Sequence, residues 1–457
     1  MKSRRNRALC IRVLALLFAT LPFAPASVIA QEQRQTPLLV MISVDGMRPD
    51  YVTGADAHGA KIPQLRRLMK EGSYADGVVG VVPTVTYPSH TTLVTGVWPA
   101  KHGIFGNTTF DPLQKNYQGW YWYAEDIRVP TLWDLATGAG RTTASIQWPA
   151  TVGAHITWNI PEFWRANTED DPKLLRAVST AGLLADLEKE IGPYPAGINA
   201  SIETDELRGQ YARWILEKKR PALLMLHLIA LDHIEHETGV FSSEDIAILE
   251  RIDAIIGNIR ATAEQLASGR AYLAVVSDHG FAKTDTQLNL FPLFRQAGLF
   301  TTDEKGKITD WRAMPWINSA AAAIVLKNPA DTATLKEVRE LLAKLAADPA
   351  NGIDRILEAD ELHQRGGFPS ASFFVNPKPG WKMGSTVDGP VLSKTKPGGT
   401  HGELPDLPDL RAAFFVVGPG VPAGHPLGII DMRDVAPTLA HLVSLSFSSI
   451  DGKNLLP

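Results

Sequence analysis

The sequence predicts an α/β fold: a mostly parallel central sheet with helices on both faces. Several short apolar runs are rich in branched residues, as the buried strands of parallel sheets are. Segments with apolar residues at helical spacing lie between these runs, and three runs lead into an aspartate. Strands that alternate with helices in this way are typical of α/β proteins.

Four apolar runs predict buried strands, at residues 38–44, 223–231, 272–277 and 413–417. Open parallel sheets bind their ligands beyond the carboxyl ends of the strands, so polar residues at these ends are candidates for a site. The acidic residues found there are Asp45, Asp232 and Asp278. Apolar residues recurring every three or four positions predict the helices, at residues 62–71, 130–137, 174–190, 203–218, 243–267, 333–347 and 433–443.

The pattern changes between about residues 290 and 395, where elements are shorter and stretches rich in glycine and proline separate them. We therefore predict one catalytic domain over residues 37–457, interrupted by a smaller inserted subdomain at about 290–395. The alternative is that the main sheet continues through this region.

Residues 1–30 predict a cleavable signal peptide, because a basic start precedes an apolar run and small residues lead up to Gln31. The apolar run is short and contains Arg12, so we expect no stable membrane span in the mature chain; an N-terminal anchor is the alternative. We expect a periplasmic or secreted protein. The single cysteine, Cys10, lies in this segment, which excludes cysteine-ligated metals from the mature chain.

The charge balance excludes one large class of partners. The net charge is −4, so no broad positive field is available to hold the backbone of DNA or RNA. A small-molecule substrate is expected instead of a polymeric nucleic acid. The sequence carries no information on the oligomeric state.

Six potential metal ligands lie beside predicted turns: Asp45, Asp232, His236, Asp278, His279 and His401. Three carboxylates and three imidazoles suit Zn²⁺ better than Mg²⁺ or Ca²⁺, and six ligands are enough for two ions. Two ions about 3.5–4 Å apart would clamp the attacking and leaving oxygens of a phosphoryl group. Taken singly, each aspartate is more simply explained as a turn former or a helix cap.

Two pairs strengthen the metal interpretation. Asp278 and His279 are adjacent at the end of a buried strand and are followed by Gly280, which permits a tight turn. Asp232 and His236 are four residues apart, which places them on one face of a helix. The alternative for the second pair is a solvated, charge-rich segment.

The segment 83–96 predicts the nucleophile, because it is rich in hydroxyl groups and Pro88 and Ser89 suit the start of a helix. Thr86 would lie just ahead of the positive end of that helix, where phosphates bind. A divalent ion can hold a threonine hydroxyl as an alkoxide at neutral pH. Without the metal ligands, a capping loop would be the simpler interpretation.

Seven motifs, in order, resemble those of the nucleotide pyrophosphatase/phosphodiesterase family, a branch of the alkaline phosphatase superfamily. The motifs are Asp45-Gly46, Pro83-Thr-Val-Thr-Tyr-Pro-Ser-His90 with Leu93-Val-Thr-Gly96, His102-Gly-Ile104, Asn107, Asp232-x-x-x-His236, Ser277-Asp-His-Gly280 and Gly399-Thr-His-Gly402. The resemblance implies a hydrolase with an alkaline phosphatase-like core that cleaves phosphodiester or pyrophosphate bonds.

The resemblance also implies the roles of the site residues. One zinc would bind to Asp232, His236 and His401, and a second zinc to Asp45, Asp278 and His279. Thr86 would bridge or face the second ion, as a further metal-binding residue, and would form a phospho-threonine intermediate. Asn107 would donate a hydrogen bond to a phosphate oxygen.

The preference for diesters over monoesters is predicted from residues 146–149. Monoesterases that use threonine carry a Lys-x-Arg pair there, whereas this chain has Ile146-Gln-Trp-Pro149 with no cation. Trp148 and Tyr87 are predicted to form aromatic walls around a nucleobase. His227, which stands where the family has a tyrosine, is also predicted to contact the substrate. Small nucleotide-like diesters are the first hypothesis. Phosphomonoesters, phosphonates and lipid-headgroup diesters remain alternatives, as does a catalytically silent binding protein.

Overall fold

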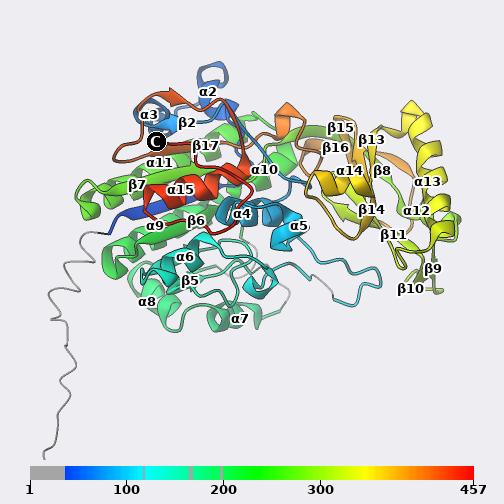
Figure 1. Cartoon of the computed structure of the whole chain (residues 1–457), viewed down its shortest axis with the longest axis horizontal. Coiled ribbons are helices and arrows are strands. Elements are labelled where there is room, and N and C mark those ends of the chain that lie inside the picture. Colours follow the sequence, from blue (N-terminus) through cyan, green and yellow to red (C-terminus); the bar gives the residue numbers. More distant parts are fainter. Residues whose placement is uncertain (1–35, 117–118, 164–167, 196–198) are drawn as a thin grey trace, which may run out of the picture. The chain divides into compact units, whose positions relative to one another are not determined.

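An eight-stranded sheet forms the centre of the chain in the computed structural model (Figure 1). The model describes residues 36–116, 119–163, 168–195 and 199–457, so the predicted signal peptide lies outside the described residues. The strand order is β18 (His425–Pro426), β2 (Ser73–Tyr74), β17 (Phe414–Val417), β7 (Ala271–Val276), β1 (Leu38–Val44), β6 (Leu223–Leu228), β4 (Thr143–Ile146) and β5 (Trp158–Ile160).

The sheet is mostly parallel, as predicted. Strands β7, β1, β6, β4 and β5 all run in one direction, and β17 pairs antiparallel with β7. Three of the predicted strands agree with β1, β7 and β17 to within one residue. The fourth, at 223–231, was predicted too long, because helix α10 (Ala230–Thr238) begins where the apolar run is still continuing. Ala230 and Leu231 are buried, and so they extend the apolar pattern across the boundary.

Helices cover both faces of the sheet, because successive side chains of β1 point to opposite sides. Val40 and Ile42 pack into one core with α3 (Pro63–Glu71), α9 (Ile202–Lys219) and α11 (Ser243–Ala267). Leu39 and Met41 pack into another core with α4 (Thr86–Thr95), α6 (Leu132–Gly138) and α15 (Val435–Leu442). The predicted α/β class is therefore confirmed.

The helix predicted at 174–190 is wrong in one respect, because the structure has two helices there. They are α7 (Asp171–Val178) and α8 (Leu183–Glu190). The backbone is extended at Ser179 and left-handed at Gly182, where φ is 79°. A glycine adopts this conformation without strain, so the chain turns between two helices whose apolar spacing looks continuous in sequence.

A second sheet and its helix occupy much of the region 290–395. Strands β11 (Ala313–Asn318), β12 (Ala321–Leu326), β14 (Ala371–Pro377) and β13 (Ile353–Glu358) pair antiparallel in that order. Helix α13 (Thr332–Ala347) packs on them through Val338 and Leu342. Its bounds agree with the predicted helix at 333–347; the division into a catalytic domain and an inserted subdomain stays a prediction.

Two strands of a third, smaller sheet lead to and from the candidate site. Strand β8 (Ala282–Asn289) begins two residues after Gly280, and β16 (Leu392–Thr400) ends directly before His401. These strands pair antiparallel, with Thr400 opposite Ala282. The pairing brings His401 close to the end of β7, although the two are far apart in sequence. In the part of the chain that the structure describes, we find no helix whose length and hydropathy would suit a membrane span.

Candidate metal centre

The six predicted ligands converge at the carboxyl ends of the central strands. Asp45 follows β1, and Asp278 and His279 follow β7. Asp232 and His236 lie on α10, which follows β6, and His401 follows β16. The start of α10 is held by Asp205 of α9, whose carboxylate accepts hydrogen bonds from the backbone N–H groups of Ile229 and Ala230 at 2.9 and 2.8 Å.

Asp45, Asp278 and His279 form the first group of candidate ligands. Each offers a ligand atom, and these atoms lie within 4.8 Å of one another. The Nε2 atom of His279 is 3.1 Å from Oδ2 of Asp278 and 3.4 Å from Oδ1 of Asp45. All three side chains are buried. This grouping is the one that the family resemblance implied for one ion.

The second group differs in one member from the implied set. Asp232 and His401 gather with His279, again within 4.8 Å. The Nε2 atoms of His401 and His236 both lie 3.6 Å from Oδ1 of Asp232. His236 is therefore beside the same carboxylate oxygen, on the more exposed side of the group. His279 lies between the two groups and stacks on His401.

His236, His279 and His401 all direct their Nε2 atom toward the candidate ion groups. Their Nδ1 atoms bond to backbone carbonyl oxygens: that of Gly399 for His236, Gly280 for His279 and Thr84 for His401, at 3.2, 3.2 and 3.0 Å. A carbonyl oxygen only accepts, so each Nδ1 carries the hydrogen and each Nε2 keeps its lone pair. Histidine ligands of metals are oriented in this way.

Asp45 and Asp278 each have one carboxylate oxygen that is hydrogen-bonded within the protein and one that has no hydrogen-bond partner among the described residues. Gly46 N–H donates to Oδ1 of Asp278, and His227 bonds to Oδ2 of Asp45. The other oxygens of both aspartates, together with Oδ1 of Asp232 and Nε2 of His279, are buried and have no hydrogen-bond partner among the described residues. Buried polar atoms are normally paired. Four unpaired ligand atoms facing one another fit divalent cations.

The electrostatics of the groups lead to the same conclusion. Burial raises the pKa of the Asp45 carboxyl well above its usual range, and the charge of Asp232 raises it further. Burial and the charge of Asp45 do the same to the pKa of Asp278. Burial lowers the pKa of His401 to about 4, which keeps its imidazole neutral near pH 7. Cations would compensate the clustered carboxylates, and neutral imidazoles are the form that binds metals.

Thr86 is the first residue of α4, which begins two residues earlier than predicted. Its carbonyl oxygen bonds to Nδ1 of His90 at 2.9 Å, and the same nitrogen lies 3.5 Å from Oδ2 of Asp278. Two residues upstream, Thr84 accepts from the N–H of Gly402 and bonds to His401 through its carbonyl oxygen. The backbone around Thr86 is thus tied to both groups of ligands.

Asn107 is held beside the same helix start. Its Oδ1 atom accepts a hydrogen bond from the backbone N–H of Tyr87 at 2.9 Å. This contact uses the oxygen of the side-chain amide, so the NH₂ group is left to donate elsewhere. The structure therefore places a polar donor group next to Thr86.

Tyr87, Trp148 and His227 were predicted to contact the substrate, but the structure buries all three completely. Tyr87 packs with Ile104 and Trp122, and Trp148 lies edge-on to His90 with ring centroids 5.0 Å apart. Buried aromatic faces cannot stack on a nucleobase, so the structure does not support this role. All three have aromatic rings and lie on or beside core elements, and the sequence does not show whether such a ring faces the substrate or is buried behind the site.

His227 instead bonds to the carboxylate of Asp45 and to that of Glu162. Glu162 was not predicted from the sequence as a site residue. Burial lowers the pKa of His227, but its hydrogen bond to Glu162 and the charge of Glu162 outweigh this effect, so the pKa lies above its usual value. Glu162 stands in Pro161-Glu162-Phe163, where no motif marks it. Its proximity arises only from tertiary structure.

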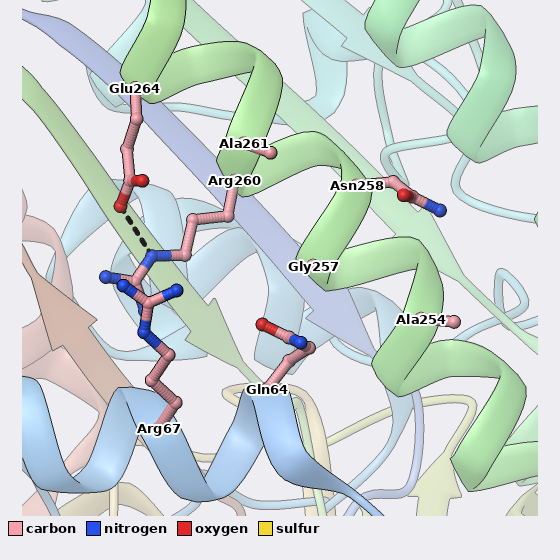
Figure 2. Close-up of a pocket in the computed structure, with 8 residues that line it drawn as sticks. All are labelled: Gln64, Arg67, Ala254, Gly257, Asn258, Arg260, Ala261 and Glu264. Carbon is pink, nitrogen blue, oxygen red and sulfur yellow. Dashed lines mark hydrogen bonds and ion pairs between the residues drawn. The ribbon is translucent and has the colours of Figure 1, made fainter.

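A separate pocket of about 390 Å³ lies between α3 and α11 (Figure 2). It is lined by Gln64, Arg67, Ala254, Gly257, Asn258, Arg260, Ala261 and Glu264. Arg260 donates to Glu264 there at 2.6 Å. The lining contains none of the predicted site residues, so this pocket is distinct from the candidate metal centre.

An α/β core with carboxylates and imidazoles grouped at its strand ends, beside a threonine at a helix start, defines a hydrolase with a candidate metal centre. Residues 39–403 match the family described as type I phosphodiesterase / nucleotide pyrophosphatase. The chain belongs to this family, and family members depend on metals to hydrolyse phosphodiester and pyrophosphate bonds.

Named relatives are similar in sequence to this chain. The chain is 23% identical to human bis(5'-adenosyl)-triphosphatase ENPP4, over 90% of this chain and 78% of that protein. It is 27% identical to human ectonucleotide pyrophosphatase/phosphodiesterase family member 1, over 54% of this chain, and the match spans only 24% of that longer protein.

Two structures of a further relative share the fold. Human ENPP5 superposes with a TM-score of 0.64 at 21% identity, covering 91% of this chain and 97% of that one. An inactive threonine-to-alanine variant of murine ENPP5, in complex with AMP, superposes with a TM-score of 0.63 at 19% identity, covering 92% of this chain and 98% of that one.

Proposed function

We propose that this protein hydrolyses the phosphodiester or pyrophosphate bonds of small, nucleotide-like substrates, with Thr86 as the nucleophile and two Zn²⁺ ions. The observation that carries the proposal is the set of unpaired ligand atoms on Asp45, Asp232, Asp278 and His279, which fall in two groups that share His279. The backbone around Thr86 is tied to both groups through His90 and His401. Family membership gives the class of reaction.

Asp45, Asp278 and His279 would hold one ion, and Asp232, His236 and His401 the other. Three carboxylates and three neutral imidazoles are ligands that Zn²⁺ accepts. Bound ions would offset negative charge on the phosphoryl group and lower the pKa of the nucleophile hydroxyl. His279 belongs to both groups of candidate ligands, which is compatible with two neighbouring ions that both lie near its imidazole.

Thr86 would attack phosphorus through its hydroxyl oxygen, which loses its proton. A new bond from that oxygen to phosphorus forms as the bond to the leaving-group oxygen breaks, which gives phospho-threonine and the released alcohol or phosphate. Water then forms a bond from its oxygen to phosphorus as the bond between Thr86 and phosphorus breaks. A proton from the water returns to the Thr86 oxygen, and the phosphate or phosphate monoester is released. The start of α4 favours an anion here, because the N-terminal end of a helix is positive.

Asn107 would donate from its amide NH₂ group to a non-bridging phosphate oxygen. The hydrogen bond from Tyr87 N–H to Oδ1 supports this role, because it fixes the amide in one orientation. A fixed donor stabilises the transition state without having to reorganise during the reaction.

The nucleotide character of the substrate is supported by the relatives rather than by aromatic walls. One relative is named as a bis(5'-adenosyl)-triphosphatase, and another is described in complex with AMP. The absence of a cation at residues 146–149 favours diesters over monoesters. The predicted signal peptide at 1–30 supports action in the periplasm or outside the cell.

The experiment compares bis(p-nitrophenyl) phosphate with p-nitrophenyl phosphate on the zinc-loaded protein. We expect faster diester hydrolysis, and Thr86→Ala should reduce turnover at least about 10³-fold with zinc content unchanged. Thr95→Ala is the matched control, because Thr95 is a buried hydroxyl at the far end of the same helix. A strong preference for the monoester, or turnover by Thr86→Ala at the normal rate, would overturn the proposal.

A further inference from the structure

His227 lies between two carboxylates in the interior, behind the candidate metal centre. Its Nε2 atom is 2.9 Å from Oδ2 of Asp45, and its Nδ1 atom is 2.8 Å from Oε2 of Glu162 and 3.1 Å from the carbonyl oxygen of Gln147. His227 is fully buried, and so is Glu162. Both ring nitrogens are therefore used within the protein.

The sheet fixes this arrangement. His227 on β6 is in register with Ser43 on β1, two residues before Asp45. Side chains two residues apart on a strand point to the same face, so His227, Ser43 and Asp45 share one face of the sheet. His90 completes the layer, because its Nε2 bonds to Ser43 Oγ at 2.8 Å and its ring centroid is 4.4 Å from that of His227.

The contact with His227 decides which oxygen of Asp45 is free. Oδ2 is bound to the imidazole, whereas Oδ1 is buried without a hydrogen-bond partner among the described residues and lies 3.4 Å from Nε2 of His279. A carboxylate held by one oxygen cannot rotate freely to present the other. His227 thus sets the direction in which Asp45 offers a ligand atom.

Glu162 in turn fixes His227. Its carboxylate contacts Nδ1 and comes from the segment after β5, at the edge of the sheet. Without it, the Gln147 carbonyl at 3.1 Å would be the remaining contact of that nitrogen. Because a histidine between two acidic oxygens can donate to both, Glu162, His227 and Asp45 form one continuous hydrogen-bonded chain.

We infer that His227 and Glu162 are a positioning pair that orients Asp45 for metal binding, so that Glu162, a buried residue just after β5, sets the affinity of the centre for its ion through His227. The inference rests on the proposed two-metal function. It assigns to His227 a role different from contact with the substrate, and it gives a function to Glu162.

The test measures zinc affinity by competition with a chelating dye, on the full-length protein. We expect His227→Gln and Glu162→Gln each to weaken the binding of one zinc ion about 10–100-fold, as changes behind metal ligands typically do. Excess zinc should restore two ions per chain. Because the pair acts as one unit, the double variant should lose about as much affinity as either single variant rather than the product of the two losses.

His102→Gln is the matched control. His102 is equally buried and hydrogen-bonded, to Thr92 Oγ1 at 3.1 Å, but among the described residues it bonds to no carboxylate of the candidate metal centre. We expect its zinc affinity to stay within about twofold of the wild type. Circular dichroism checks that each variant is folded; if His227→Gln does not fold, Glu162→Gln decides alone, since it preserves the side-chain volume.

Folded variants that bind zinc as tightly as the wild type would overturn the inference and leave the proposed function intact. So would a loss of turnover with unchanged zinc affinity, because that result would mean that the pair acts on catalysis without affecting metal binding. A wild-type protein that binds no zinc would overturn the inference and the proposed function together.

Discussion

The imidazole rings of His279 and His401 stack face to face, with centroids 3.7 Å apart and an angle of 9° between their planes. One ring follows the central strand β7 and the other follows β16, and each Nε2 points toward a carboxylate, at Asp278 and Asp232 respectively. The two candidate ion groups therefore meet at a rigid aromatic contact. A substitution that shifts either β7 or β16 should therefore alter the position of ligands in both candidate ion groups.

Removal of the metal should inactivate and destabilise the protein. The carboxylates of Asp45, Asp232 and Asp278 face one another, and without cations their repulsion opposes folding. A ligand present at about 1,000 times its Kd stabilises the folded state by about 4 kcal/mol, and chelation should remove a contribution of this order. Hydrolysis and thermal unfolding are measured with and without EDTA, and again after zinc is restored. Unchanged turnover after exhaustive chelation would refute a role for metals.

Asn107 should be needed as a donor rather than as a cap. Asn107→Asp keeps an oxygen that can accept from Tyr87 N–H at the position of Oδ1 but replaces the NH₂ donor. We expect kcat to fall about 10²–10³-fold in Asn107→Asp, as in Asn107→Ala, with zinc content unchanged. If Asn107→Asp kept full activity while Asn107→Ala lost it, the side chain would serve only to fix the start of α4.

Thr84, two residues before Thr86, should stabilise the segment around His401 through its hydrogen bonds. Its hydroxyl donates to the carbonyl oxygen of Glu403 at 2.7 Å and accepts from Gly402 N–H at 3.0 Å, all within the interior. Thr84→Val keeps the shape but leaves both backbone groups unpaired, at a cost of about 1–3 kcal/mol in the free energy of unfolding. Urea denaturation measures this cost, and steady-state kinetics should show a further loss of kcat. A variant with normal stability would show that these bonds are replaced by water.

The sequence predicted four of the eight strands of the central sheet, β1, β6, β7 and β17, and the gathering of the ligands, because both follow from local patterns. Strand β1 and helix α11 have the predicted bounds, since apolar spacing and turn residues mark them clearly. Asp45, Asp278 and Asp232 were found because parallel strands end at one edge. The turn at Gly182 was missed because apolar residues continue on both sides of it.

Contacts that depend on tertiary structure could not be read from sequence. Glu162 has no flanking pattern, and its value as a site residue comes from the 2.8 Å contact with His227. The burial of Tyr87 and Trp148 likewise depends on what covers them, which the strand and helix pattern does not specify. The order of the motifs identified the candidate metal ligands and Thr86. Which residues surround them depends on packing and is known only from the structure.

Anomalous diffraction at the zinc absorption edge, from crystals of zinc-loaded protein, tests the central claim most directly. We predict two peaks per chain: one bounded by Asp45, Asp278 and His279, and one bounded by Asp232, His236 and His401, with the Thr86 hydroxyl beside them. A single peak, no peak, or peaks away from these six side chains would contradict the two-ion centre.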